Sequence, residues 1–312
     1  MVPICGLCRL DRAELIDWAV RRVIVNADDF GLTPGVNRAI SELHQDGVLS
    51  SATLMALAVA TDNAVGLALS TASMGVGCHV VLVDGQPVLP PSEIPTLVDQ
   101  KTGMFYPTLG GFLRRVLTGY IRPAEIETEA AAQISLLKER GLQLTHFDTH
   151  KHTHMFPAVL RPVLRAARAA GIRCLRNPFE PEWSRRGTPR APLLRRMEVS
   201  LLGRLEPAFQ RVVAEEGFAT TDGALGVLAT GTLDETTIRS LLQGAPPGTW
   251  ELVTHPGYID TDLERVHTRL RESREIERFA LTAVGRVDDL ELISFAGLAL
   301  EGEGIPVNLQ RK

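Results

Sequence analysis

One short segment carries four of the chain's eight histidines. It spans residues 146–157 and reads HFDTHKHTHMFP. Imidazole and carboxylate groups are good ligands for Zn²⁺, Mn²⁺ and similar divalent ions. If the strand before the segment continues through it, alternate residues share one face, and these are Asp148, His150, His152 and His154. The spacing indicates a metal site with His150 as the favoured ligand, whereas His152 and His154 fit better as substrate contacts or as supports behind the ligands.

Two adjacent aspartates, Asp28 and Asp29, form a second candidate for chemistry. They directly follow the β-rich run 23–27. Neighbouring carboxylates repel each other in a site with little water unless a cation or a proton lies between them. A divalent ion bound by one of them, with the other acting as a base, would resolve the conflict. The alternative is structural, because one aspartate could instead cap the helix predicted from Pro34.

Other polar residues lie on or directly after further β-rich runs: His79, Asp148, Arg176 and His255. Each has an ordinary explanation when taken alone, since a His-Pro-Gly turn such as that at His255 often simply ends a strand. In parallel α/β folds, however, the carboxyl ends of the strands meet at one edge, where ligands bind. Their joint placement predicts one site built from several strands.

The elements that must position these residues alternate between β-rich runs and helical patterns. The predicted strands are 23–27, 49–55, 75–83, 142–148, 172–177 and 250–257, and the predicted helices are 34–46, 61–70, 122–140 and 157–170. Thr33 followed by Pro34 is a typical helix start, with a capping residue before a proline at the first helical position. Alternation of this kind is typical of parallel βαβ units around a sheet or barrel.

We expect a single α/β domain over residues 22–298. Residues 1–21 would be an N-terminal extension and residues 299–312 a C-terminal tail. Two segments, 84–121 and 178–215, depart from the alternating pattern and are long enough to be lids or interfaces over one end of the scaffold.

Each long segment carries a feature that could serve recognition. The first contains the aromatic residues Phe105, Tyr106 and Phe112, which could stack on a sugar or pack in a dimer interface. The second contains an arginine-rich stretch at 183–198. It could meet phosphate or an acidic headgroup, although solvated helix faces are the favoured interpretation.

Composition excludes some classes of protein. The 312 residues include 45% hydrophobic and 22% charged residues, and the net charge of −4 offers no attraction to nucleic acid. No run of 18 apolar residues predicts a membrane span. Four cysteines make no disulfide framework, and Cys5-x-x-Cys8 alone is a weak metal signal, so we expect a cytoplasmic protein. A homodimer and peripheral contact with a membrane stay open.

Four strings together resemble the YdjC-like carbohydrate deacetylase family. They are 24-IVNADDFGLTPGVNRAI-40, 77-GCHVVLVDG-85, the histidine-rich segment 146–157, and 254-THPGY-258. The resemblance covers roughly residues 23–298, and the four strings occur in the family's order. The loop 79-HVVLVDGQPVLPP-91 is most similar to the hopanoid-biosynthesis-associated branch of the family, HpnK.

This resemblance implies a distorted TIM-like (β/α) barrel, related to the NodB-type polysaccharide deacetylases. It also implies a divalent metal ion, Mg²⁺ or Zn²⁺ with Mn²⁺ or Co²⁺ as further choices, held by Asp29, His79 and His150. Asp28 would be the general base and His255 the general acid. The family more commonly has other residues at Cys78 and Val80, which bears on the shape of the pocket rather than on metal binding.

The implied reaction is removal of an N-acetyl group from an N-acetylglucosamine-type sugar, free or on a glycolipid such as a hopanoid. From their positions at strand ends, Asp148 could orient an imidazole and Arg176 could hold Asp28 or a sugar hydroxyl. Two alternatives remain. One is another barrel metallohydrolase, a phosphoesterase or amidohydrolase that could carry a second metal ion, and the other is a non-catalytic sugar- or lipid-binding relict. The relict is disfavoured because both the candidate base and the candidate acid are present.

Overall fold

Strands and helices alternate along the chain in the computed structural model, which describes residues 20–188, 191–287 and 289–302. The strands are β1 (Arg21–Phe30), β2 (Ser51–Leu54), β3 (Gly75–Val80), β4 (Phe147–Thr149), β5 (Cys174–Leu175), β6 (Ala219–Thr220), β7 (Gly223–Leu225), β8 (Gly248–Thr254) and β9 (Glu291–Leu292). The α-helices are α2 (Pro34–Gln45), α3 (Thr61–Ser70), α4 (Leu109–Leu117), α5 (Pro123–Glu139), α6 (Pro157–Ala169), α7 (Glu182–Arg186), α8 (Leu193–Leu202), α9 (Glu206–Glu215), α10 (Glu235–Gly244), α11 (Thr261–Arg265), α12 (Arg271–Val284) and α13 (Phe295–Gly302). Two short 3₁₀ helices, η1 (His150–Met155) and η2 (Gly203–Leu205), complete the described elements.

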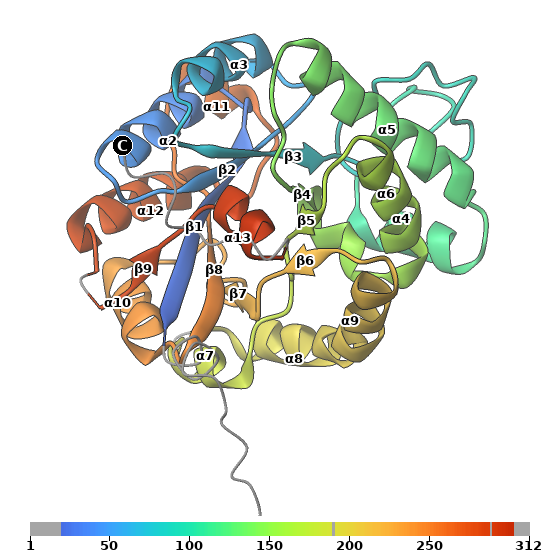
Figure 1. Cartoon of the computed structure of the whole chain (residues 1–312). Helices are drawn as coiled ribbons and strands as arrows, with labels where there is room; N and C mark the ends of the chain where they lie inside the picture. The colour runs from blue at the N-terminus through green and yellow to red at the C-terminus, as the bar shows by residue number, and fades with distance from the viewer. Residues whose placement is uncertain (1–19, 189–190, 288, 303–312) are drawn as a thin grey trace, which may run out of the picture.

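The nine strands form one curved sheet surrounded by helices (Figure 1). Its order is β6-β5-β4-β3-β2-β1-β8-β7, with β9 beside the start of β1, and these strands pair in parallel. The two end strands, β6 and β7, are consecutive in the chain. The loop after β5 reaches both sides of this opening, because the Asn177 side chain donates to the Thr221 carbonyl (3.1 Å) and Ala224 N donates to the Phe179 carbonyl (2.9 Å). The predicted distorted (β/α) barrel is confirmed.

The first turn of the barrel forms as the sequence predicts. Thr33 is the N-cap of α2, its hydroxyl accepts a hydrogen bond from Val36 N (3.2 Å), and Pro34 is the first helical residue. Since Thr33 supplies the cap, the structural alternative for Asp28 and Asp29 is wrong. Both carboxylates are left for other contacts.

The strand predicted at 142–148 is shorter than expected. Only Phe147–Thr149 pairs as β4, and the chain then turns into η1 with positive φ angles at Lys151 (57°) and His152 (52°). The prediction that alternate residues of the histidine-rich segment share one strand face is therefore wrong. The left-handed backbone at these two residues breaks the alternation and sends each imidazole in its own direction.

The long segment 84–121 is held in place by α5. Three buried polar residues, one turn apart on this helix, contact the backbone of the preceding segment: Glu125 accepts from Thr96 N and Leu97 N, Glu129 from Val88 N and Leu89 N, and Gln133 pairs with both backbone groups of Val81. The aromatic residues of the segment are buried in the core: Phe105, Tyr106 and Phe112. The prediction that they stack on a sugar or form an interface is therefore wrong.

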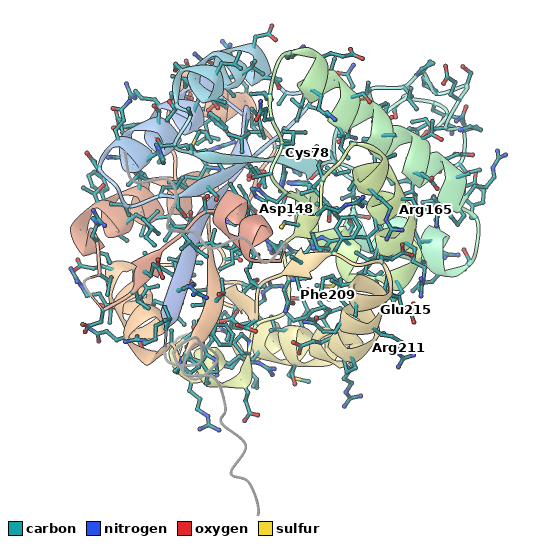
Figure 2. The ribbon with its side chains drawn as sticks, viewed as in Figure 1. Cys78, Asp148, Arg165, Phe209, Arg211 and Glu215 are labelled. Atoms are coloured by element: carbon teal, nitrogen blue, oxygen red, sulfur yellow. The ribbon has the colours of Figure 1, made fainter. Side chains whose placement is uncertain are left out.

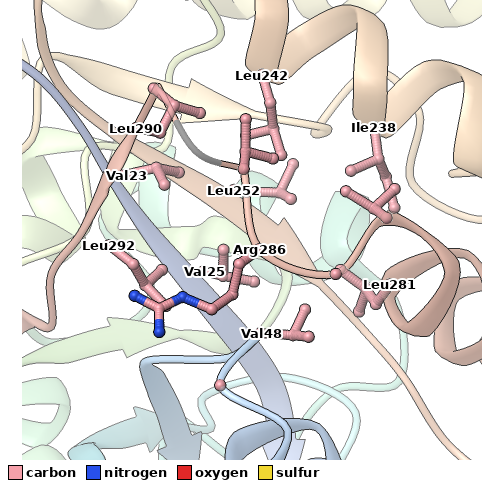
Figure 3. Close-up of a pocket in the computed structure, with 14 residues that line it drawn as sticks. Val23, Val25, Val48, Ile238, Leu242, Leu252, Leu281, Arg286, Leu290 and Leu292 are labelled. Carbon is pink, nitrogen blue, oxygen red and sulfur yellow. The ribbon is translucent and has the colours of Figure 1, made fainter.

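An apolar cavity lies in the outer layer between the first half of β1, β8 and the helices α10 and α12 (Figure 3). Its volume is about 30 Å³, and it is lined mainly by aliphatic side chains such as Val23, Val25 and Leu252, with Arg286 at its edge. The cavity is remote from the carboxyl ends of the strands. We interpret it as a packing void.

The predicted domain limits stay predictions. Most of the extension 1–21, including Cys5 and Cys8, lies outside the described residues, although β1 already begins at Arg21. The tail predicted from residue 299 overlaps the end of α13, and residues 303–312 also lie outside the described range.

Candidate active site

The end of β1 presents two buried carboxylates to the same end of the barrel. In a regular strand, adjacent side chains point to opposite faces. Here the register shifts between Ala27 and Phe30, and Asp29 has a φ of 62°. Because of this departure, both carboxylates can lie at the carboxyl ends of the strands. Asp28 is 3% exposed and Asp29 is 4% exposed. Non-glycine residues adopt such a backbone rarely, and strain of this kind concentrates at functional sites.

Asp29 meets two imidazoles in a nearly equilateral triangle. Its Oδ1 lies 3.4 Å from His79 Nε2 and 3.5 Å from His150 Nδ1, and these two nitrogens are 3.2 Å apart. The centre of such a triangle is about 2.0 Å from each corner, which is the usual distance from Zn²⁺ to a nitrogen or oxygen ligand. The three residues therefore fit one divalent ion without rearrangement.

His79 is oriented by Asp148, its direct cross-strand neighbour on β4. The Asp148 carboxylate lies 2.7 Å from His79 Nδ1, which leaves Nε2 facing Asp29. Burial alone would lower the pKa of His79, but the carboxylates of Asp148 and Asp29 have the larger effect and raise that pKa to about 10. Without a metal ion, His79 is therefore protonated at neutral pH, and its positive charge lies where a metal ion could bind. A carboxylate behind a metal-binding imidazole is a common arrangement that fixes the tautomer.

Arg176, fully buried at the end of β5, gathers three carboxylates. Its guanidinium lies 2.6 Å from Asp28 Oδ1, 2.5 Å from Asp148 Oδ2 and 2.7 Å from Glu251 Oε1. Although burial opposes ionisation, the guanidinium holds the pKa of Asp28 and that of Asp148 below their usual values. Asp28, His79 and Asp148 are also close enough to share an ion, but both carboxylates of this set already pair with the Arg176 guanidinium. We therefore favour the Asp29 cluster as the metal site.

His255 faces Asp28 from the end of β8. Its Nε2 lies 3.6 Å from Asp28 Oδ2, and its backbone N donates to Glu277 Oε2 at 2.6 Å. Burial lowers the pKa of His255 to about 4, against the raising effect of the two aspartates. Burial also raises the pKa of Glu277 to about 8. His255 is therefore a neutral imidazole at neutral pH before any substrate or metal ion binds.

None of the other histidines of the 146–157 segment belongs to the Asp29 triangle. His154 is fully buried and uses both nitrogens, toward Thr149 Oγ1 (2.8 Å) and the Arg176 carbonyl (3.2 Å), so it supports the site from behind. His152 keeps a buried Nδ1 with no hydrogen-bond partner. His146 stacks on Phe295 with ring centroids 3.9 Å apart, on the far side of the strand.

Three buried charged residues of the site escaped the sequence analysis: Glu251, Arg274 and Glu277. Arg274 forms a short ion pair with Asp29 Oδ2, the carboxylate oxygen that faces away from the imidazoles. A signal existed on α12, where Arg274 and Glu277 continue the stripe of core residues Ala280 and Leu281. Charged residues at core-facing helical positions are rarely left buried without a specific partner. Glu251 gave a similar signal as an acid inside an apolar strand.

The whole arrangement lies inside the ring of helices, as the position of Asp148 illustrates (Figure 2). It defines a parallel (β/α) barrel protein with a carboxylate–imidazole cluster at the carboxyl ends of its strands. Such clusters are suited to one divalent ion with an acid and a base beside it.

Comparison with known proteins places the chain in a family. The YdjC-like protein family model matches residues 22–290. A carbohydrate deacetylase from Listeria monocytogenes is 30% identical over 284 residues, which cover 89% of this chain and all of that protein. A carbohydrate deacetylase from Brevibacillus brevis is 43% identical over 146 residues, about half of each chain (47% and 55%). This chain belongs to the YdjC-like family.

A solved structure supports the fold. A crystal structure of an Enterococcus faecalis protein superposes with a TM-score of 0.70 over 89% of this chain and 99% of its own, at 24% identity. None of the helices in the described ranges is long and apolar enough to cross a membrane.

Proposed function

We propose that this protein is a metal-dependent hydrolase that removes an N-acetyl group from an amino sugar of the N-acetylglucosamine type. The observation that carries the proposal is the triangle of Asp29, His79 and His150, flanked by Asp28 on one side and by His255 beyond it. The relatives named carbohydrate deacetylases support hydrolysis of an amide C–N bond.

Each side chain has a defined task in this reaction. A divalent ion held by Asp29, His79 and His150 would polarise the acetyl carbonyl and lower the pKa of water. Asp28, held by Arg176, accepts the proton from the attacking water. Asp148 fixes the tautomer of His79. Arg274 pairs with the outer oxygen of Asp29 and so keeps the inner oxygen directed at the imidazoles.

Breakdown of the amide also needs a proton on the departing nitrogen. His255 is neutral beforehand because burial lowers its pKa to about 4, so the proton must reach it during the reaction. Asp28 lies 3.6 Å from His255 Nε2 and can pass on the proton taken from water. The water oxygen joins the acetyl carbon, the C–N bond breaks, and acetate and the free amine leave.

Finer features of the proposal rest on narrower support. The loop 79–91 resembles the hopanoid-associated HpnK branch, which favours a glycolipid substrate. Two imidazoles and one carboxylate suit Zn²⁺ or another transition ion, with Mg²⁺ as the alternative. We also propose that the protein is cytoplasmic and forms a single catalytic domain over residues 22–298, with Asp148, His152, His154 and Arg176 as substrate contacts or supports.

The alternative of a phosphoesterase or amidohydrolase with two metal ions has less support. A second ion would need the cluster of Asp28, His79 and Asp148, yet Arg176 already provides the positive charge there. A non-catalytic relict has less support as well, because it would not need a buried carboxylate and a buried imidazole beside the metal-binding cluster.

Acetate release tests the proposal. The full chain, loaded in turn with Zn²⁺, Mn²⁺, Co²⁺ and Mg²⁺, is incubated with N-acetylglucosamine oligosaccharides and with N-acetylglucosaminyl lipids. We expect acetate from at least one substrate and its loss with a chelator. Phosphate esters and cyclic amides serve as comparison substrates. Turnover of these without any acetate from the sugars would replace the proposal with the alternative hydrolase.

A further inference from the structure

Helix α8 carries an apolar face that the fold leaves uncovered. Four large side chains on it are strongly exposed: Leu193 (74%), Leu194 (78%), Met197 (61%) and Leu201 (61%). Each helical residue turns the direction by about 100°, so these four fall within a sector of about 100°. We call this set the α8 apolar face. A contiguous exposed apolar patch of this kind is often a functional surface.

The rest of α8 is fixed to the protein, so the apolar face is held outward. Val199 packs with Ala191 and Leu228 in a small buried cluster. Arg195 donates to the Val227 carbonyl (3.1 Å), and Arg196 donates to the Ala191 carbonyl (3.2 Å). The helix cannot rotate its leucines inward without breaking these contacts.

The anchoring contacts also place α8 at the end of the barrel that carries the site. Val227 and Leu228 directly follow β7, and Leu228 N donates to Glu180, which follows β5. Arg176, at the end of the same strand β5, belongs to the active site. The α8 apolar face therefore lies beside the carboxyl ends of the strands.

The charge around α8 is opposite to that of the rest of the chain. Residues 182–211 contain seven arginines and three glutamates, a net charge of +4, whereas the whole chain has −4 and the remainder therefore −8. Arg186, Arg204 and Arg211 are exposed, and Figure 2 shows Arg211 pointing outward from α9. An apolar helix face flanked by arginines on an otherwise acidic protein is the pattern of a helix that lies on an anionic membrane surface.

A second copy of the chain fits this surface poorly. The four side chains expose on the order of 500 Å², whereas a standard interface buries about 800 Å² of each partner. A two-fold dimer would also bring the same patch of both copies together, so that two +4 segments would repel each other. An anionic lipid surface satisfies both the leucines and the arginines. We propose that the α8 apolar face binds an anionic lipid surface and so places the carboxyl ends of the barrel strands next to that surface.

Vesicle sedimentation tests this docking without any turnover, so its outcome is separate from that of the deacetylase proposal. The full chain is mixed with vesicles of phosphatidylcholine alone or of phosphatidylcholine with phosphatidylglycerol. We expect binding to the mixed vesicles, weakened by salt. The Leu194→Ser/Leu201→Ser variant should bind at least about tenfold more weakly. The matched control is Leu69→Ser/Leu117→Ser, which removes two exposed leucines from α3 and α4 and should bind like the parent.

Three results would overturn the proposal. One is no binding to either kind of vesicle, and another is equal binding by the α8 variant and the parent. The third comes from sedimentation equilibrium without lipid: if the parent is a dimer and the α8 variant a monomer, the face belongs to a second copy. Circular dichroism on each variant ensures that a loss of binding does not reflect unfolding.

Discussion

At the scale of single residues, the site depends on which nitrogen of each histidine is free. In His79 one nitrogen contacts Asp148 and the other contacts Asp29. In His154 both nitrogens are engaged, one by the Thr149 hydroxyl and one by a backbone carbonyl. His150 directs Nδ1 to Asp29. Imidazoles only a few residues apart in the sequence therefore have different capacities to bind a metal ion.

The first prediction separates these roles. We expect His150→Ala to weaken metal binding by at least about 100-fold and to remove most acetate release, because one of three ligands is lost. His154→Gln should keep one ion per chain, with metal affinity reduced by about tenfold at most. Metal content after dialysis and titration of the metal-free protein measure both effects. Metal loss in His154→Gln together with retention in His150→Ala would contradict the assignment.

A second prediction concerns Arg176. Because it compensates Asp28, Asp148 and Glu251 in a buried site, Arg176→Met should lower the free energy of unfolding by about 3–5 kcal/mol. Arg239→Met is the control, since it breaks an exposed pair with Glu235 and should cost about 1 kcal/mol or less. Urea unfolding of the metal-free proteins measures both. Equal stabilities of the two variants would show that Arg176 does not hold the carboxylates together.

At the scale of elements, glycines decide how closely strands and rings approach. A Cβ on Gly77 of β3 would lie 2.6 Å from the ring of His146, which is itself stacked on Phe295. A Cβ on Gly66, inside α3, would meet nothing within 4 Å. Packing therefore requires glycine at position 77, whereas Gly66 lowers the stability of α3 without any packing reason.

These two glycines give the third prediction. Gly77→Ala should destabilise the protein by about 1–3 kcal/mol, because the buried ring has no space to shift. Gly66→Ala should stabilise it by about 0.5–1 kcal/mol through helix propensity. Thermal and urea unfolding measure the opposite signs. A neutral Gly77→Ala would mean that the His146 ring can move.

At the scale of the whole molecule, buried neutral histidines make stability depend on pH. Burial lowers the pKa of His146 to about 3 and that of His154 to about 4, both below the ordinary value of 6.5. The unfolded chain therefore takes up these protons first as the pH falls. Stability is fully present above about pH 6.5 and is lost progressively as the pH falls toward the folded-state values.

The fourth prediction uses His146→Phe to isolate one of these groups. Between pH 7.5 and pH 5, the parent should lose about 2 kcal/mol more of unfolding free energy than the variant, since each pH unit below 6.5 is worth about 1.4 kcal/mol per buried neutral histidine. Urea unfolding at both pH values measures the difference. Parallel losses in the two proteins would show that His146 becomes protonated in the folded state.

Much of this molecule follows from local sequence. Alternating β-rich and helical runs predicted parallel βαβ units around a sheet or barrel, and Thr33 with Pro34 predicted the start of α2, because caps and periodicity act over a few residues. The placement of polar residues after several strands predicted one site, because parallel strands present their carboxyl ends to the same edge. The choice of Asp29, His79 and His150 as a set within that site came from the resemblance to the YdjC-like family.

Other features were decided only by tertiary structure. The partner of Arg274, Asp29 on β1, lies 245 residues away in the sequence, and that of Glu277, His255 directly after β8, lies 22 residues away, so no local pattern names them. The left-handed backbone at Asp29, Lys151 and His152 is held by surrounding contacts against its intrinsic cost, and it overrides the alternation expected of a strand. The sequence by itself determined which groups lie at the carboxyl ends of strands, because the end of a strand is a local property of the sequence. The fold decided which of those groups face each other, because side-chain direction in a crowded buried site depends on every neighbour at once.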